Sequence, residues 1–400
     1  MNNDIHDLNE WLIKIRREFH SIPEKSFREF KTQQKIIDIL RDMGIKYEMV
    51  AGTGIVATID GIESGKCIAL RADMDGLEVT EQLTKKNLEY ISRHPGFMHA
   101  CGHDAHMTMV LGAAKLLNKN RRCFRGSIKL IFQPAEEQPP GGAREMIAQG
   151  VLEGVDAIIG IHVFTSLDTG TVALKKGSLM ASSNMFSMTI QGKGGHHSDY
   201  DKCIDPIAIA SEFICSIRKE IDQMLGHGSY AMGFGNIHSG SQFNRIPDCV
   251  YMDGSVRTFS CDHIDMIENT FRDVLDNLMK KYSLKHLPGL PSYTLKLSRA
   301  YPVLINNPGF TESATRFLVN NYDNINPEIK KFFGSEDFAF YLRKIPGTFI
   351  LLGAKNIEKG IVERNHSNRF DIDEDILIKG SNIMYCLSMD FLKNPESYLI

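Results

Sequence analysis

The chain has 400 residues, of which 42% are hydrophobic and 24% charged, a composition typical of a soluble globular protein of two or three domains. The net charge of −3 provides no field that would attract nucleic acid or an anionic membrane, so we expect neither as a partner. The polar start at Met1–Asp4 does not resemble a secretory signal, and no apolar run approaches the roughly 20 residues of a membrane span.

The spacing of the cysteines indicates the redox state of the compartment in which the protein is expected. Eight cysteines are spread singly along the chain, at positions 67, 101, 123, 203, 215, 249, 261 and 386. They form no CxxC pair and no compact framework, which favours free thiols in a reducing environment. We therefore expect a cytoplasmic protein.

Helices and strands alternate in the first part of the chain. Apolar spacing, caps and breakers predict helices over 8–19, up to about 43, over 104–117 with Asp104 as a cap, and after 142. Short apolar runs predict strands over 54–60, 67–72, 127–132 and 157–163. This alternation favours an α/β sheet that is covered by helices on both faces.

The middle of the chain follows another order. Strands over 185–191, 231–237, 250–259 and 293–297 and helices over 206–225 and 262–281 give the sequence βαββαβ, a ferredoxin-like α+β arrangement. The α/β pattern then resumes, with a helix over 308–320, a strand over 349–352 and a helix from 373. We predict a large mixed-sheet α/β catalytic domain in residues 1–181 and 294–400, interrupted by a small lid domain in residues 182–293.

The segment Met98–His106 concentrates groups that bind metal. It holds a thiol, three imidazoles and a carboxylate within nine residues, and these are ligands of zinc-like ions. Cys101 and His103 are two apart, so in an extended chain both point the same way, and Gly102 between them permits a tight turn. We interpret His99 and His106 as histidines that support the ligands or lie on a helix face.

Adjacent carboxylates follow the predicted strand 127–132. Burying Glu136 and Glu137 together is costly unless cations are present. Because neighbouring side chains diverge, one carboxylate can bind metal while the other removes a proton from a water of lowered pKa. A solvated acidic turn is the alternative, but the prolines and glycines around the pair favour a positioned loop. His162 ends the strand 157–163, at the sheet edge where α/β proteins place their sites. By itself His162 would more often be structural, and His366 alone is a weaker candidate still.

Taken in order, these segments resemble one family, the dinuclear-metal aminoacylase and carboxypeptidase superfamily. The branch they resemble most contains N-acyl-amino-acid amidohydrolases: hippurate hydrolases, auxin-conjugate hydrolases and N-acetyl-diaminopimelate deacetylases. The resemblance covers nearly the whole chain, and its motifs are Arg17–His20 with Pro23–Glu24, Leu70–Leu77, Met98–His106, Phe132–Glu137, Gly334–Phe338 and Arg364–Asp371. Arg71 stands where more distant relatives carry a histidine ligand, which fits the thiol-using branch.

The resemblance implies roles for the matching positions. The ligands of two divalent ions (zinc, manganese, cobalt or nickel) would be Cys101, His103, Glu137, His162 and His366, with Cys101 bridging the ions. Glu136 would be the general base that later protonates the leaving amine. The inserted domain would act as a lid and form a homodimer. From it His196 would reach the partner's active site and stabilise the oxyanion, while Asn244 and Arg257 would bind substrate. Relatives have a proline soon after the lid histidine, and its absence here leaves His197 as an alternative acting residue.

The function implied is hydrolysis of an N-acyl amino acid to a carboxylic acid and a free amino acid. A dipeptidase or aminopeptidase with the same metal centre is an alternative, although we identify no acidic anchor for a substrate amine. A catalytically silent, metal-stabilised binding protein is a second alternative, which the retention of Glu136 beside a complete ligand set disfavours. A nucleobase zinc deaminase would need a PCxxC motif that the chain lacks.

Overall fold

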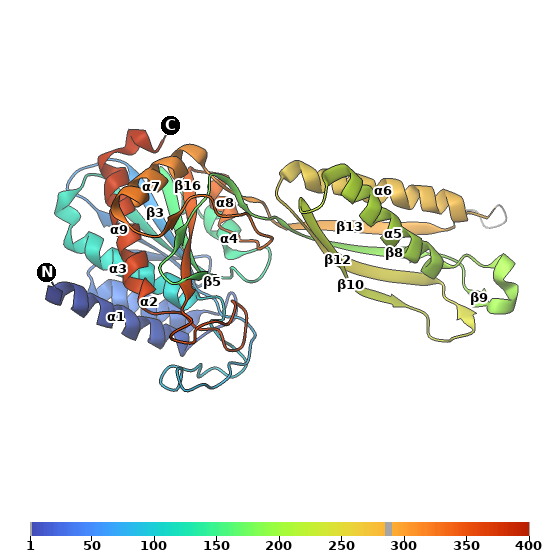
Figure 1. The fold of residues 1–400 in the computed structure, drawn as a ribbon, viewed down its shortest axis with the longest axis horizontal. Helices are drawn as coiled ribbons and strands as arrows, with labels where there is room; N and C mark the ends of the chain where they lie inside the picture. Colours follow the sequence, from blue (N-terminus) through green and yellow to red (C-terminus); the bar gives the residue numbers. More distant parts are fainter. Residues whose placement is uncertain (1, 285–289, 400) are drawn as a thin grey trace. The chain divides into compact units, whose positions relative to one another are not determined.

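A computed structural model describes residues 2–284 and 290–399. The chain divides into two compact units (Figure 1). The larger unit comprises Met1–Leu179, Leu304–Lys330 and Asp337–Ile400, and the smaller unit comprises Met180–Val303 and Lys331–Glu336.

The larger unit is built on a mixed sheet of eight strands in the order β1-β2-β4-β3-β5-β16-β6-β15. Its strands are β1 (Lys46–Val50), β2 (Gly54–Asp60), β3 (Cys67–Asp73), β4 (Ser127–Gln133), β5 (Ala157–Asp168), β6 (Val172–Ala173), β15 (Ile325–Asn326) and β16 (Gly347–Lys355). The central strands β4, β3, β5 and β16 run parallel, whereas β1 and β2 form an antiparallel edge. The carboxyl ends of β4, β3 and β5 therefore meet at one edge of the sheet.

Helices cover both faces of this sheet. They are α1 (Asn2–His20), α2 (Phe30–Asp42), α3 (His103–Lys119), α4 (Gly142–Ala148), α7 (Pro308–Asn321), α8 (Ala339–Leu342) and α9 (Ile376–Lys393). On one face, α1, α3 and α9 pack together and share a hydrophobic core with alternate residues of the central strands (Figure 1). On the other face, Phe338 stacks near Phe349 of β16 and near Tyr341 of α8, with ring centroids 5.0 and 5.8 Å apart. The predicted two-sided α/β sheet is confirmed.

The smaller unit has the predicted βαββαβ order. Its elements are β8 (Ser183–Gln191), α5 (Pro206–Leu225), β10 (Tyr230–Ser239), β12 (Cys249–Thr258), α6 (Cys261–Tyr282) and β13 (Ser292–Tyr301). The four strands form an antiparallel sheet in the order β10-β12-β8-β13. Alternate residues of β8 point to one face, where Phe186 joins Phe213 of α5 and Phe271 of α6 in a core of its own. This unit continues past the expected boundary at 293, because β13 pairs with β8 as far as Tyr301.

Short elements complete the fold. A two-stranded sheet pairs β7 (Gly177–Met180) with β14 (Leu304–Asn306), and another pairs β9 (Gly195–His196) with β11 (Arg245–Ile246). None of the eight cysteines, all of which are described, forms a disulfide. Within residues 2–284 and 290–399, no helix combines the length and the apolar character that crossing a membrane requires.

Candidate metal centre

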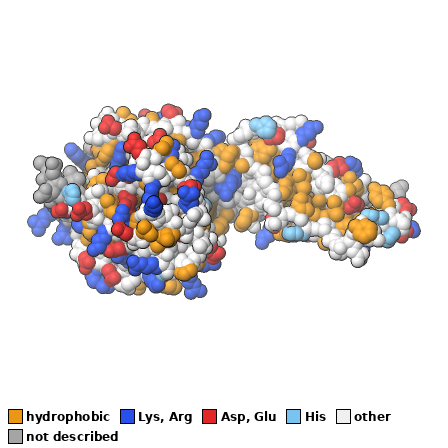
Figure 2. Space-filling model, turned by 60° about the horizontal axis from the view of Figure 1, so that its bottom comes forward, with side chains coloured by type: hydrophobic (Ala, Val, Ile, Leu, Met, Phe, Trp, Pro, Cys, Tyr) orange, Lys and Arg blue, Asp and Glu red, His pale blue; other side chains and the backbone are white. Residues whose placement is uncertain are grey.

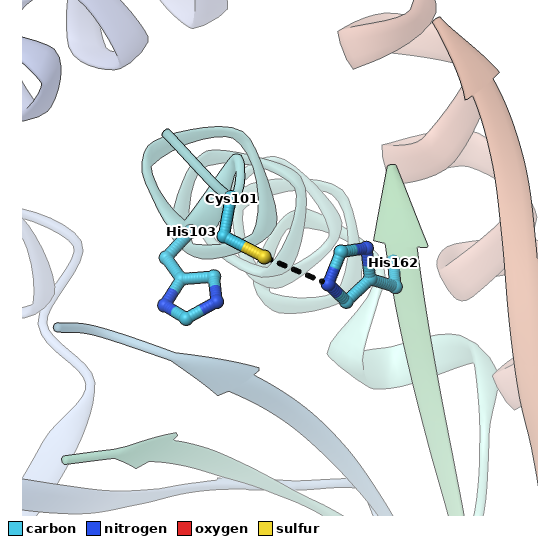
Figure 3. A group of neighbouring side chains, drawn as sticks. All are labelled: Cys101, His103 and His162. Carbon is cyan, nitrogen blue, oxygen red and sulfur yellow. Dashed lines mark hydrogen bonds between the residues drawn. The ribbon is translucent and has the colours of Figure 1, made fainter. Parts of the chain in front are cut away.

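The five predicted ligands converge in the larger unit. The ligand atoms of Cys101, His103 and His162 all lie within 4.8 Å of one another, as do those of Cys101, Glu137 and His366. The sulfur of Cys101 is central, because it lies 3.4 Å from Nε2 of His162 and 3.3 Å from Nε2 of His366. Figure 3 shows this sulfur pointing from the chain before α3 toward the His162 ring on β5, with His103 beside it.

Cys101 and His103 converge through a turn rather than through an extended strand. Gly102 has a φ of 93°, in the left-handed region that favours glycine, and α3 begins at the next residue. A Cβ at Gly102 would lie 2.3 Å from a methyl carbon of Val163, so no larger residue fits. Two sequence-based interpretations are therefore corrected: strand alternation does not align the two ligands, and Asp104 lies inside the helix instead of capping it.

Backbone carbonyls set the orientation of two histidine ligands. Nδ1 of His103 lies 2.9 Å from the carbonyl oxygen of Asp75, and Nδ1 of His162 lies 2.9 Å from that of Val163. A carbonyl can only accept, so in each ring Nδ1 donates and Nε2 is the nitrogen left to bind a metal ion, which in His103 would displace a proton. Both Nε2 atoms face the cluster, as metal-binding imidazoles require.

The Glu136–Glu137 pair follows β4 and lies beside His103. One ligand atom from each of His103, Glu136 and Glu137 falls within a common 4.8 Å. The preceding Ala135 adopts a left-handed φ of 55°, which turns the chain sharply between the strand and the two carboxylates. Glu136 is only 5% exposed, so its carboxylate is held in a largely dry environment.

His366 approaches from a distant part of the chain. Its φ is 72°, and its backbone N–H donates to the carbonyl of Ala100 over 2.7 Å. The side chain of the preceding Asn365 donates to the carbonyls of Cys101 and Val163, at 3.2 and 3.0 Å. These bonds tie the loop of His366 to the segments of two other ligands. The His366 side chain is 55% exposed, which leaves one side of the cluster open to solvent.

The charges of the site favour a cation. Burial lowers the pKa of His103, but the nearby Asp73 and Asp75 outweigh it and raise that pKa to about 10. Burial and the neighbouring His106 hold the pKa of His162 well below its usual range, so this ring is neutral. Burial and the carboxylates of Glu137 and Glu136 raise the pKa of the Cys101 thiol, which therefore becomes a thiolate only when a cation compensates the charge.

Divalent ions fit this donor set. Ligands bound at 2.0–2.3 Å around a tetrahedral ion lie about 3.5 Å apart, and the sulfur–nitrogen distances of 3.3 and 3.4 Å agree with that spacing. Among the described residues, Nε2 of His103 and Oε1 of Glu137 are buried and have no hydrogen-bond partner. Buried polar atoms are rarely left so, and bound ions would satisfy both.

The sequence reasoning gave no role to two supporting acids, Asp73 and Asp75, although it expected His99 and His106 to support the ligands or lie on a helix face. Asp73 ends the buried strand β3, and Asp75 follows two residues later, where its carboxylate lies 3.2 Å from Nδ1 of His103. His106 accepts from the backbone N–H of Val163 over 2.9 Å and lies 2.6 Å from Asp73, so both its ring nitrogens are engaged. The sequence feature that could have identified Asp73 and Asp75 is their position, two residues apart, where a buried strand ends. His99 is buried, and its two nitrogens have no partner among the described residues.

Arg71 is buried and forms an ion pair with Asp73, which supports His106. Its guanidinium donates to Asp73 over 2.7 Å, to Gln133 over 2.9 Å and to Asp337 over 2.8 Å. The latter two belong to the motifs Phe132–Glu137 and Gly334–Phe338. Arg71 thus connects the ends of β3 and β4 with the segment before α8.

The remaining candidates lie in the smaller unit. His196 is exposed on β9, where it pairs with Arg245, and the backbone N–H of His197 donates to the carbonyl of Asn244 over 3.2 Å. His196, His197 and Asn244 are therefore neighbours. Arg257 lies near the carboxyl end of β12, whereas Asn244 precedes the amino end of that strand. The Arg257 guanidinium donates to the carbonyl of Phe333 over 2.7 Å. Within this unit, Arg257 does not join the other three.

Comparison with known proteins agrees with these observations. A family model described as peptidase family M20/M25/M40 matches residues 69–390. The chain is 37% identical over 398 residues to Thermostable carboxypeptidase 1 of Saccharolobus solfataricus, with 98% of each chain covered. It is also 37% identical over 399 residues to N-acetyl-L-cysteine deacetylase of Bacillus subtilis, with 98% of this chain and 91% of the relative covered.

A solved structure extends the similarity to the fold. The YXEP protein of Bacillus subtilis, described as a dinuclear metal binding peptidase from the M20 family, matches with a TM-score of 0.83 and 34% identity. The match covers 97% of this chain and 99% of that one. Since the family model and these relatives span most of its length, the chain belongs to peptidase family M20/M25/M40, in the amidohydrolase branch, and is a metallohydrolase that acts on carbon–nitrogen bonds.

Proposed function

We propose that the protein hydrolyses N-acyl amino acids to a carboxylic acid and a free amino acid. The observation that carries this proposal is the convergence of five metal-ligating side chains beside a further carboxylate, that of Glu136. The similarity to a relative named as an N-acetyl-L-cysteine deacetylase supports an acylated amino acid as the substrate class.

In this proposal two divalent ions would be held by Cys101, His103, Glu137, His162 and His366. When bound, such ions lower the pKa of a water and polarise the scissile carbonyl. Glu136 accepts the proton of the attacking water while the oxygen adds to the carbonyl carbon. Glu136 then delivers this proton to the amide nitrogen as the carbon–nitrogen bond breaks, so the amine leaves neutral.

The smaller unit supplies the remaining groups of the proposal. His196, or its neighbour His197, donates a hydrogen bond to the oxyanion that forms at the carbonyl, and it acts in the active site of a partner subunit. Asn244 and Arg257 bind the substrate. Closure of this unit as a lid excludes water from the reacting bond.

We infer a homodimer formed through the smaller unit. The strand β10 is an edge of its sheet, and its distal half is exposed, with Ile237 51% exposed. Phe243, in the segment that follows, is 94% exposed. Figure 2 shows hydrophobic side chains gathered over the face of this unit that is in view. Unpaired strand edges and apolar patches of this kind favour association with a second copy, which a molecular mass measured in solution tests.

The types of donor atom limit which metal ions the site can bind. Thiolate and imidazole suit zinc, cobalt and nickel, whereas the carboxylate also admits manganese. We propose that one of these four is the native metal and that the free thiols reflect a reducing cytoplasm. Reloading the metal-free protein with each ion in turn, and measuring turnover, identifies the one that is used.

A carboxypeptidase is the second candidate, and the relative named Thermostable carboxypeptidase 1 favours it. Both substrates release an amino acid with a free carboxylate, so the same centre serves either. The two substrate classes differ only in the group that acylates the amine of the released amino acid. Parallel assays with acetyl-amino acids, benzoyl-amino acids and peptides, including peptides with a free amino terminus, separate these candidates from a dipeptidase.

The variant Glu136→Gln tests the proposed function. Glutamine keeps the size of the side chain but cannot carry the proton, so we expect kcat for an N-acyl amino acid to fall at least about 1,000-fold. Bound metal, measured by elemental analysis, should stay at the wild-type level because Glu136 is not among the proposed ligands. Hydrolysis close to the wild-type rate, with metal still bound, would contradict the role of Glu136.

A further inference from the structure

Glu29 is a buried carboxylate that belongs to neither the ligand set nor the proton-transfer step. It is 0% exposed and directly precedes α2. Its side chain makes no capping bond to that helix. The amides of Lys31 and Thr32 in the first turn instead donate to Glu24, over 2.8 and 2.9 Å. The position of Glu29 is therefore explained by what its side chain contacts elsewhere.

The Glu29 carboxylate accepts hydrogen bonds from the backbone N–H groups of two residues in the left-handed conformation and from one hydroxyl group. Oε1 accepts from the backbone N–H of Ala135 and from that of Phe27, each over 2.9 Å. Ala135 has a φ of 55° and Phe27 a φ of 61°, which L-residues with a side chain rarely adopt. Oε2 accepts from Oγ1 of Thr53. One carboxylate thus stabilises two backbone conformations that are unfavourable by themselves.

The turn at Ala135 sets the direction of the next two side chains. The amides of Glu136 and Glu137 donate to Asp75 over 3.1 and 3.0 Å. Asp75 also accepts from the hydroxyl of Ser26, at 2.7 Å, in the same turn as Glu29. Three successive amides, 135 to 137, are thereby held by two buried carboxylates, and the carbonyl of Ala135 accepts from Gly142 over 3.1 Å.

We propose that Glu29 is a positioning residue, which holds Ala135 in its left-handed conformation and thereby aims the Glu136 carboxylate at the attacking water. This rests on the proposed role of Glu136. Without the acceptor at Oε1, Ala135 relaxes toward ordinary backbone angles, and the carboxylate that follows is displaced. Displacements of about 1 Å at a reacting group reduce rates by about 100-fold.

The test compares Glu29→Met, which removes the acceptor at similar length, with Glu29→Gln, which keeps an acceptor oxygen. We expect Glu29→Met to lower kcat for an N-acyl amino acid about 10- to 100-fold with KM changed less than about 3-fold. Glu29→Gln should recover most of that loss. Hydrogen exchange at the amides of residues 135–137 should accelerate in Glu29→Met, a readout that is independent of turnover.

Two further variants keep the test decisive. Glu24→Met removes a carboxylate that supports α2 in the same segment but touches no part of the site, and it serves as the matched control. Ala135→Gly removes the penalty of the left-handed conformation, so adding it to Glu29→Met should restore kcat at least about 5-fold.

Two results would overturn the positioning role: a kcat of Glu29→Met within twofold of the Glu24→Met control, or amide exchange at 135–137 unchanged from wild type. An absence of rescue by Ala135→Gly counts against it in the same way. If Glu136→Gln retains activity, the proposed role of Glu136 fails, but the exchange measurement still reports whether Glu29 holds Ala135.

Discussion

His20 is a buried histidine outside the proposed ligand set, and its pKa depends on its charged neighbours. It ends α1 and is 1% exposed, with Nδ1 2.7 Å from Asp104 and Nε2 3.2 Å from Glu81. Burial and the nearby Arg16 lower the pKa of His20, but Asp104 and Glu81 outweigh them and raise that pKa to about 9. The imidazolium is therefore part of the folded structure at neutral pH.

The raised pKa predicts how stability depends on pH. Between about pH 6.5 and 9 the folded protein holds a proton at His20 that the unfolded chain has lost, so this contribution is complete below 6.5 and disappears above 9. At about 1.4 kcal/mol per pH unit it amounts to ~3 kcal/mol. In denaturant unfolding at pH 6, 7.5 and 9.5, the advantage of the wild type over His20→Gln should shrink by that amount. A difference that is the same at all three pH values would contradict the assignment.

Residue types and spacing led to the proposed ligands, whose side chains the structure brings together, but not to the groups that orient them. Cys101, His103 and the two glutamates lie in short motifs whose chemistry is recognisable in sequence. Asp75 bonds the amide of Glu136 across 61 positions of the chain, and Ala135 bonds Glu29 across 106. No local pattern encodes such contacts, because they depend on how distant loops meet after folding.

At the scale of elements, close packing of α3 on α9 is the feature that positions His103. A Cβ at Gly112 of α3 would lie 2.3 Å from Oγ of Ser381 and 2.7 Å from Cδ2 of Leu12. Ser381 is itself held, since its hydroxyl donates to the carbonyl of Leu377 over 2.9 Å. The helices therefore approach too closely for any larger residue at position 112.

Gly112→Ala should consequently destabilise the protein despite the better helix propensity of alanine. Overpacking costs about 1–3 kcal/mol, whereas the propensity gain is about 1 kcal/mol. We expect a net loss of about 1 kcal/mol in denaturant unfolding together with weaker metal binding, because α3 begins at His103. Gly233→Ala is the matched control, since a Cβ there meets nothing within 4 Å. If Gly112→Ala is as stable as Gly233→Ala, the contact at position 112 is relieved without a loss of stability, contrary to this prediction.

Most elements could be predicted because their apolar residues keep the period of a helix or a strand. The long helices α5 and α6 and the strand β8 follow this rule. The edge strand β1 could not, because its residues are mostly exposed and alternate poorly. Its extended form depends on pairing with β2, a tertiary contact that outweighs local preference.

For the whole molecule, the two units divide the proposed chemistry. The five ligands and Glu136 belong to the larger unit, whereas His196, Asn244 and Arg257 belong to the smaller one. The chain leaves the larger unit near β7 and returns near β14, and these two strands pair with each other. The ends of the insertion are thus adjacent, and a short linker can replace it.

Replacing residues 182–302 with a short glycine–serine linker should separate metal binding from turnover. We expect the remaining protein to bind metal with an affinity within about tenfold of wild type, because all five proposed ligands and the groups that orient His103 and His162 lie in the larger unit. Hydrolysis of N-acyl amino acids should fall at least about 100-fold through loss of the proposed oxyanion donor. Chelator competition and steady-state assays measure the two quantities. Wild-type turnover in this variant would refute the contribution of the smaller unit.

The separation of Cys101 from His366, 265 positions along the chain, has a consequence for biogenesis. A ribosome synthesises the whole smaller unit after the first four metal donors and before the last one. With the proposed ligand set, both ions can be fully coordinated only after translation has passed His366, so we expect metal loading to be a late event in synthesis.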